Sequence, residues 1–317
     1  MKKFNKVVSA IILSAGALTL TSVSATNLLS PGHLSPSQTE QGQMKEYIVI
    51  FDLSAKVAGM SNSDFMTIQK RKLTKNSPLT VKKIFKHSGM MLIQTAQAAV
   101  TSLQMAQNVL FITENRAIRT IPKKQPKKQP KANVNYNLQT QYNNLPSWGL
   151  DRVDQRYLTL DGQYNTPRGG AGVTAYVLDT GTVASTNEFD DATGQTRLRM
   201  GYNPFRDDFD STDCHGHGSH VSGTVGGTNY GIAKEVSLVA VRVMECGEVK
   251  TVANIIEGME WVIDDVASHQ GPAVVNMSLS DPDGSVAWDN ATQAMIDAGI
   301  TVVVAAGNNF YDACKNS

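Results

Sequence analysis

The sequence predicts a doubly wound α/β domain, with helices on both faces of a parallel sheet, preceded by a smaller α+β unit. Beyond Trp148, short apolar strands alternate with stretches of helical periodicity. Strands without polar alternation that are separated by helices are typical of a parallel sheet buried on both faces. The predicted strands are Val173–Leu178, Val236–Val243, Ala273–Met277 and Ile300–Ala305, and the predicted helices are Val252–Ala267 and Val286–Ala298.

The smaller unit precedes this domain and follows a different pattern. Its elements are predicted in the order β-α-β-β-α-β, which is that of a ferredoxin-like unit. They are the strand Glu46–Phe51, the helix Asp64–Lys72, the strands Thr80–Phe85 and Met90–Thr95, the helix Gln97–Gln107 and the strand Val109–Thr113.

The first 25 residues are predicted to be a secretory signal peptide. Three lysines precede the apolar run Val7–Leu20, and Val23-Ser24-Ala25 supplies a small-x-small cleavage pattern. The run is too short for a membrane-spanning helix. We therefore expect a secreted protein, extracellular or periplasmic, with no membrane partner.

A linker is predicted between the two folded parts. Residues 122–144 begin with PKKQPKKQPK and continue rich in Asn and Gln, a composition that cannot bury a core. The predicted organisation is a signal peptide (1–25), the smaller unit (45–121), the linker (122–144) and the larger domain (145–317). Lys plus Arg number 29 against 28 Asp plus Glu, so charge gives no reason to expect a nucleic-acid partner.

Polar residues at the ends of apolar strands are the candidate functional residues, because ligands bind beyond the carboxyl ends of strands in such sheets. Asp179 lies in AYVLDTG, His217 precedes a predicted helix, and Asn308 is the first Asn of VVVAAGNN. Asp-Thr-Gly alone also occurs in aspartic proteases, and Cys214 with three nearby histidines could form a zinc cluster. Neither alternative accounts for all three segments in this order.

Together these segments resemble the subtilisin family of serine proteases. VLDTG resembles its Asp motif, GHGSHVSGT its His motif with Ser219 and Ser222 as departures, and VVVAAGN the strand that carries its oxyanion Asn. The resemblance covers about residues 148–314 and is closest to the proteinase K-like branch. The segment from Ser88 to Thr120 resembles the end of the inhibitory propeptide of such proteases.

The resemblance implies catalytic roles for the three residues. Asp179 would orient His217, His217 would act as general base, and Asn308 would stabilise the oxyanion. The Gly-Thr-Ser-Met-Ala motif that carries the nucleophile in this family is absent from the 317 residues. We therefore expect a secreted serine endopeptidase precursor that acts on proteins or peptides, is inhibited by its own propeptide, and is here truncated and inactive. The alternative is a non-catalytic secreted binding protein.

Further residues are implied by the same resemblance. Cys214 and Cys246 would form a disulfide, which leaves Cys314 without a partner within this sequence. Two of the segments that would line the substrate depart from the glycine-rich pattern of the family. The predicted lining residues are Gly247, Ser278, Leu279, Ser280, Ala306 and Gly307.

A structural calcium ion is also expected from the resemblance, because oxygen ligands gather where the proteinase K-like branch binds calcium. The predicted ligands are Asp151, Asp154, Gln155, Asp161 and Gln163.

Overall fold

The computed structural model describes residues 43–118 and 145–308, apart from residues 158, 167, 245–249, 270 and 282. The predicted signal peptide and linker, Cys246, Gly247 and Cys314 lie outside the described residues. Within the described parts, every helix is too short or too polar to cross a membrane.

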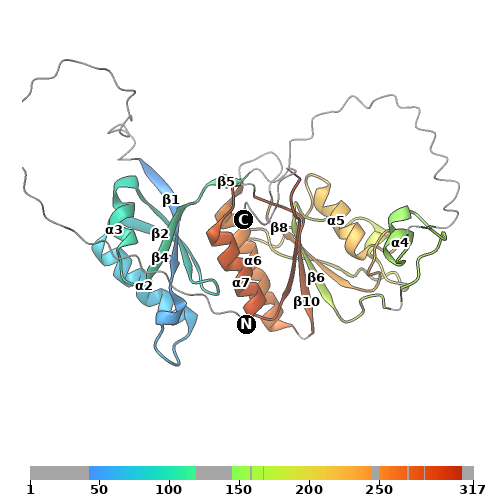
Figure 1. Ribbon diagram of the computed structural model, residues 1–317, viewed down its shortest axis with the longest axis horizontal. Coiled ribbons are helices and arrows are strands. Elements are labelled where there is room, and N and C mark those ends of the chain that lie inside the picture. Colours follow the sequence, from blue (N-terminus) through green and yellow to red (C-terminus); the bar gives the residue numbers. More distant parts are fainter. Residues whose placement is uncertain are drawn as a thin grey trace, which may run out of the picture. The chain divides into compact units, whose positions relative to one another are not determined.

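The smaller part is a four-stranded antiparallel sheet in the order β2-β3-β1-β4. This order is that of a ferredoxin-like unit, and Figure 1 shows α2 and α3 on the same face of the sheet. The strands are β1 (Met44–Phe51), β2 (Leu79–Phe85), β3 (Met90–Ala96) and β4 (Val109–Glu114). The helices are α2 (Asn62–Asn76) and α3 (Val100–Gln104), with short 3₁₀ turns at Leu53–Ala55 and Gln97–Ala99.

The second helix of this unit is shorter than the predicted Gln97–Gln107. Its first turn is a 3₁₀ turn, and the α-helix ends at Gln104. The chain must reverse before β4, and Asn108 adopts a left-handed conformation with φ of 67° to do so. Asn tolerates this conformation better than most residues, so the turn ends the helix early.

The larger part contains a five-stranded parallel sheet in the order β11-β10-β6-β8-β7. The chain runs from β6 to one side of the sheet and then to the other, so the strand order reverses beside β6. The predicted α/β fold class is confirmed. The strands are β6 (Thr174–Asp179), β7 (Leu198–Met200), β8 (Ser237–Arg242), β10 (Ala273–Met277) and β11 (Thr301–Val304).

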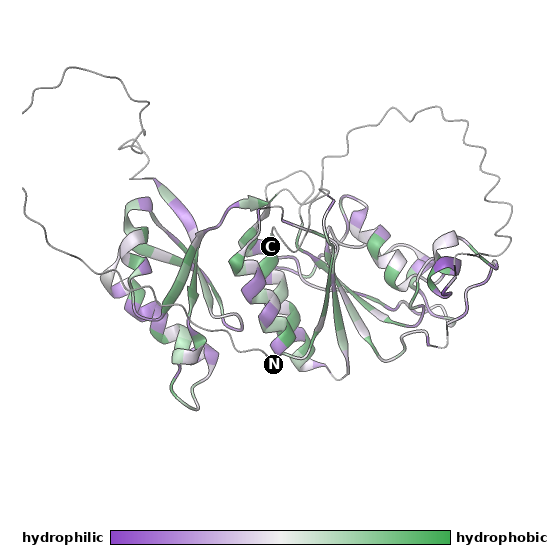
Figure 2. Ribbon diagram, viewed as in Figure 1, coloured by the Kyte–Doolittle hydropathy of each residue, from purple (hydrophilic) through white to green (hydrophobic). Residues whose placement is uncertain are grey.

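Helices cover both faces of this sheet, as Figure 1 shows. On one face, Ala175 and Val177 of β6 join a cluster with Val221 and Val225 of α5 (His217–Gly226). On the other face, Tyr176 and Leu178 belong to the cluster that includes α6 (Val252–Ser268) and α7 (Val286–Asp297). Figure 2 shows apolar residues along the strands and mixed polarity along α6 and α7. Burial on both faces explains the apolar strands.

Smaller elements were not predicted from the sequence. The helix α4 (Trp148–Val153), a 3₁₀ turn at Asn187–Phe189 and the edge strand β7 are short, so their patterns are weak. Two further strands, β5 (Ala117–Ile118) and β9 (Lys250–Thr251), pair antiparallel with each other across a long sequence separation.

Candidate active site

Asp179 is the last residue of β6 and lies at the position where the strand order of the parallel sheet reverses. Such positions, beyond the carboxyl ends of the strands, are where α/β sheets bind ligands. The Asp179 side chain is fully buried, and Thr180 N–H donates to its Oδ1 at 2.7 Å.

His217 is hydrogen-bonded to this carboxylate. Its Nδ1 lies 2.8 Å from Oδ1 and 2.9 Å from Oδ2 of Asp179. A carboxylate only accepts hydrogen bonds, so Nδ1 carries the proton, and Nε2 of the neutral ring is left with a lone pair that can accept one. The His217 side chain is 35% exposed, whereas Asp179 is 0% exposed. Burial raises the pKa of Asp179, and the hydrogen bonds from His217 and Thr180 oppose that rise.

Two glycines allow the segments that carry this pair to meet. A Cβ atom on Gly218 would lie 2.1 Å from the carbonyl oxygen of Gly181, and one on Gly181 would lie 2.3 Å from that of Ser211. Gly181 also has a φ of +100°, which disfavours other residues. The glycines of Asp-Thr-Gly and His-Gly-Ser are therefore required by this close backbone approach.

Asp213 is a residue of the site that the sequence reasoning missed. Its Oδ1 accepts from Thr180 Oγ1 at 2.8 Å and from the N–H groups of His215 and Gly216 at 2.8 and 2.9 Å. Its Oδ2 accepts from Ser219 N and Oγ at 2.9 and 2.5 Å. The position of Asp213 four residues before His217 was the available signal, but it resembles an ordinary turn.

This network replaces the usual cap of helix α5. Gly216 at the N-cap has no side chain, so Thr180 Oγ1 accepts from Gly218 N at 2.9 Å while Asp213 accepts from Ser219 N. Both N–H groups belong to the first helical turn, where no backbone carbonyl within the helix can accept from them. Burial raises the pKa of Asp213, but the hydrogen bonds outweigh that effect and leave its pKa lowered. Asp213 thus joins the Asp179 segment to the His217 helix.

The other predicted site residues lie along the same edge of the sheet. Asn308 and Gly307 follow β11, are exposed, and are separated from β6 by β10. Ser280 Oγ lies 3.9 Å from where a Cβ on Gly307 would stand, which brings two predicted lining segments together. Ser278 Oγ accepts from Asn276 Nδ2 at 3.0 Å. Ala306 is exposed, but Leu279 is 4% exposed and belongs to the hydrophobic cluster that includes Ile118.

The predicted calcium ligands do not form a cation cage in this structure. Asp151 Oδ1 accepts from Gln155 Nε2 and Asp161 N, and its Oδ2 accepts from Gly162 N. Asp154 and Asp161 accept from the backbone N–H groups of Asn165 and Gln163. Within residues 43–118 and 145–308 as described, no three His, Cys, Asp or Glu side chains gather as a metal site. These carboxylates are occupied by N–H donors in this structure, and the calcium ion stays a prediction.

Cys214 is disulfide-bonded in the structure. Its predicted partner Cys246 lies outside the described residues, so the pairing with Cys246 stays a prediction.

A buried Asp that is hydrogen-bonded to Nδ1 of a His is also the arrangement of these two residues in Ser-His-Asp sites. Residues 170–316 match the model of the Subtilase family, Peptidase_S8. This part of the chain therefore matches the family that its motifs resemble.

Known proteins with similar sequences are serine proteinases. The chain is 49% identical to an extracellular serine proteinase of Thermus sp. (strain Rt41A) over 53% of its own length and 39% of that protein. It is 46% identical to alkaline serine exoprotease A of Vibrio alginolyticus over 54% of its length and 30% of that protein. The chain thus spans well under half of these relatives. A solved cold-adapted subtilisin-like serine proteinase is 47% identical, with a TM-score of 0.49, over 54% of this chain and 59% of that one.

Proposed function

We propose that the chain is the precursor of a secreted serine endopeptidase that hydrolyses peptide bonds by acyl transfer. The observation that carries the proposal is the hydrogen-bonded pair of Asp179 and His217 within residues that match the Subtilase family. Secretion is supported by the signal-like N-terminus and by the extracellular relative from Thermus. The nucleophilic Ser would come from a segment that these 317 residues do not contain.

Each residue has one role in the proposed reaction. His217 Nε2 takes the proton of the Ser hydroxyl as its oxygen attacks the peptide carbonyl, and later gives that proton to the leaving amine. Asp179 holds Nδ1–H and stabilises the imidazolium. Asn308 donates its side-chain amide to the oxyanion, a kind of contact that contributes about 3–4 kcal/mol in a subtilisin. Water then hydrolyses the acyl-enzyme through the same base.

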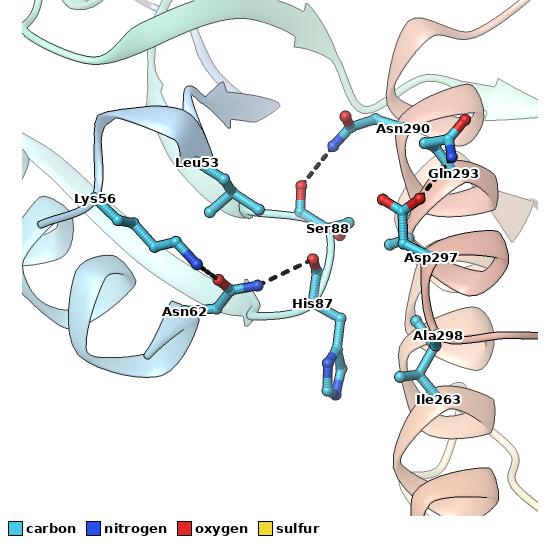
Figure 3. Close-up of a pocket in the computed structure, with 11 residues that line it drawn as sticks. Leu53, Lys56, Asn62, His87, Ser88, Ile263, Asn290, Gln293, Asp297 and Ala298 are labelled. Carbon is cyan, nitrogen blue, oxygen red and sulfur yellow. Dashed lines mark hydrogen bonds between the residues drawn. The ribbon is translucent and has the colours of Figure 1, made fainter. Parts of the chain in front are cut away.

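We assign the smaller part of the chain as the inhibitory propeptide. The carboxylate of Glu260 in α6 accepts from His87 N at 2.9 Å, Ser88 N at 2.8 Å and Ser88 Oγ at 2.6 Å. Asn290 in α7 donates to the Ser88 carbonyl oxygen, a contact drawn in Figure 3 beside a cavity of about 320 Å³. These contacts hold the turn between β2 and β3 against the two helices.

The end of the smaller part supports the same assignment. Asn115 Oδ1 accepts from Ala253 N at 3.0 Å, and Arg116 O accepts from Val252 N at 3.2 Å. These N–H groups belong to the first turn of α6 and lack intrahelical partners. Strand β5 then pairs with β9, which follows the predicted lining residue Gly247 in the sequence. A peptide that pairs along a substrate-lining strand blocks it.

The second candidate is a non-catalytic secreted binding protein with the same fold. The Cys214–Cys246 disulfide is part of either proposal. Structural calcium is proposed only from the family resemblance.

The test is to read the coding DNA beyond Ser317 and to express the 317-residue chain beside any longer in-frame product. A longer product that contains Gly-Thr-Ser-Met-Ala should turn over a chromogenic peptide and react with a fluorophosphonate, and its His217→Ala variant should not. The 317-residue chain should do neither. If the 317-residue chain turned over the peptide robustly and the fluorophosphonate blocked this turnover, another Ser of the chain would act as the nucleophile. A stop codon at this position would favour the binding protein.

A further inference from the structure

Arg116 binds the loop that follows β10. Its guanidinium contacts the carboxylate of Asp281, donates to the carbonyl oxygen of Gly284 at 2.6 Å, and lies 3.6 Å from Asp283 Oδ2. The Asp281 side chain is 4% exposed, and the Arg116 side chain is 30% exposed. A planar guanidinium that meets two carboxylates and a carbonyl makes charge-assisted hydrogen bonds in several directions, which an ammonium group cannot reproduce.

The backbone around Arg116 lies as a bound peptide would. Ala117 and Ile118 pair antiparallel with Thr251 and Lys250, which is the way an extended peptide adds a strand to a protein. The Ile118 side chain is 3% exposed and joins the hydrophobic cluster that contains Val252 and Ile256. The segment therefore presents an aliphatic anchor, with an arginine two residues before it.

The loop continues directly from predicted lining residues. Ser278 to Ser280 precede Asp281, and Ser280 lies near Gly307 of the second lining segment. In this loop the sequence departs from the glycine-rich pattern of the family and carries two carboxylates, Asp281 and Asp283. A carboxylate as buried as that of Asp281 is costly unless a cation is bound to it. Once the Arg116 segment leaves, both carboxylates are open to another cation.

We propose that the carboxylates of Asp281 and Asp283, with the carbonyl oxygen of Gly284, form a binding subsite for an arginine side chain of the substrate. The arginine stands two residues before an aliphatic residue that takes the place of Ile118, and Arg116 occupies the subsite in the precursor. This inference rests on the proposed endopeptidase function and names the substrate class: peptides with Arg-x-aliphatic in this register.

Peptide binding to the full 317-residue chain with Arg116→Ala tests the proposal without the missing nucleophile. The probes are fluorescent octapeptides with the sequence of residues 113–120, TENRAIRT, and versions with lysine or citrulline in place of the first arginine. Citrulline keeps the shape of arginine but not its charge. The Arg116→Ala substitution weakens the chain's own segment, so added peptide can displace it. Fluorescence anisotropy measures the affinity, and hydrogen exchange of residues 115–118 reports the displacement.

We expect the arginine peptide to bind at least about tenfold more tightly than the citrulline peptide, with lysine between them. The substitution Asp281→Asn, added to Arg116→Ala, should reduce that preference to below about threefold. The matched control is Asp264→Asn, which removes a carboxylate 2.8 Å from Lys86 Nζ, outside this loop. It should leave the preference unchanged.

Two results overturn the proposal, and they are distinguishable. Equal affinity of the arginine and citrulline peptides, or a preference that survives Asp281→Asn, overturns the subsite and leaves the proposed function standing. If no peptide binds and none displaces residues 115–118, these strands do not bind peptides, and the proposed function fails together with the subsite.

Discussion

The proposed site has two sides that are stabilised by different contacts. The catalytic side contains Asp179 and Asp213, and the peptide side contains Asp281 and Glu260. On the catalytic side, Asp179 and Asp213 are satisfied by groups from Thr180 to Ser219 of the same domain. On the peptide side, Asp281 binds Arg116, and Glu260 binds the turn at Ser88, both in the smaller part of the chain. The catalytic geometry is thus organised within the domain, whereas the peptide side depends on a segment that is proposed to leave. Substitutions on the two sides should therefore have separable effects.

The largest effect is expected from Gly218→Ala on the catalytic side. The new Cβ would lie 2.1 Å from the Gly181 carbonyl oxygen, so helix α5 must shift away from the Asp179 segment. We expect a loss of about 3 kcal/mol in the free energy of unfolding, typical of a backbone clash in a packed core. The measurement is urea unfolding followed by tryptophan fluorescence, because Trp148, Trp261 and Trp288 all lie in the larger domain.

The matched control is Gly223→Ala in the same helix, where a Cβ meets nothing within 4 Å. Alanine there should stabilise the domain by about 0.5–1 kcal/mol because it favours the helix. Equal losses for the two variants would contradict the close approach of Gly218 and Gly181.

Asp213→Ala should have the next largest effect. It leaves the N–H groups of His215, Gly216 and Ser219 without their acceptor, so we expect a loss of about 2–3 kcal/mol by the same unfolding measurement. The NMR signal of His217 Nδ1–H should also change as helix α5 loosens. Asp210→Ala, in an exposed turn of the same stretch, should cost less than about 1 kcal/mol and leave that signal in place. An unchanged His217 signal in Asp213→Ala would show that Asp213 does not help to position His217.

Glu260→Ala tests the peptide side. It removes the acceptor of the His87 and Ser88 N–H groups, and we expect about 1–3 kcal/mol less protection of residues 86–90 in hydrogen exchange. Protection at residues 177–180 should stay the same, because the catalytic side does not use this contact. An equal loss of protection at residues 86–90 and 177–180 would show that the two sides are not independent.

The smallest effect is a pH dependence of stability from Asp179 and Asp213, whose pKa values shift in opposite directions. The pKa of Asp213 lies below its ordinary value of 3.8, so its contribution to stability is present above pH 3.8 and is lost as pH falls through the lowered pKa. The stability difference between wild type and Asp213→Asn should be constant from pH 7 to about 5 and shrink below about 4.

Asp179 should behave in the opposite sense. Its pKa is raised by burial, so the ionised form weakens folding above the ordinary pKa of 3.8, and that penalty disappears as pH falls through the raised pKa. The difference between wild type and Asp179→Asn should move in favour of wild type as the solution is acidified. If acidification changed the stability difference from wild type in the same direction for Asp213→Asn and Asp179→Asn, the assigned directions of the two pKa shifts would be wrong.

Several features were predictable because local patterns carry them. The apolar runs before Asp179 and Asn308 predicted buried parallel strands, and the structure has them as β6 and β11. Asp213 was not predicted, because an aspartate in a loop of four aspartates looks like a solvated turn. Its role follows from five donors that converge on it only when Thr180 and α5 come together.

By itself, the sequence determined the order of strands and helices, the subtilase motifs and the glycines that let Asp179 and His217 approach each other. The element order depends on hydrophobic periodicity, and the motifs and glycines lie within short stretches of sequence. Only the tertiary structure decided that Arg116 meets Asp281, 165 positions along the chain, and that Glu260 meets Ser88, 172 positions before it. A charged side chain pairs with whichever opposite charge the fold brings within a few ångströms, and that distance is set by the packing of whole elements rather than by sequence spacing.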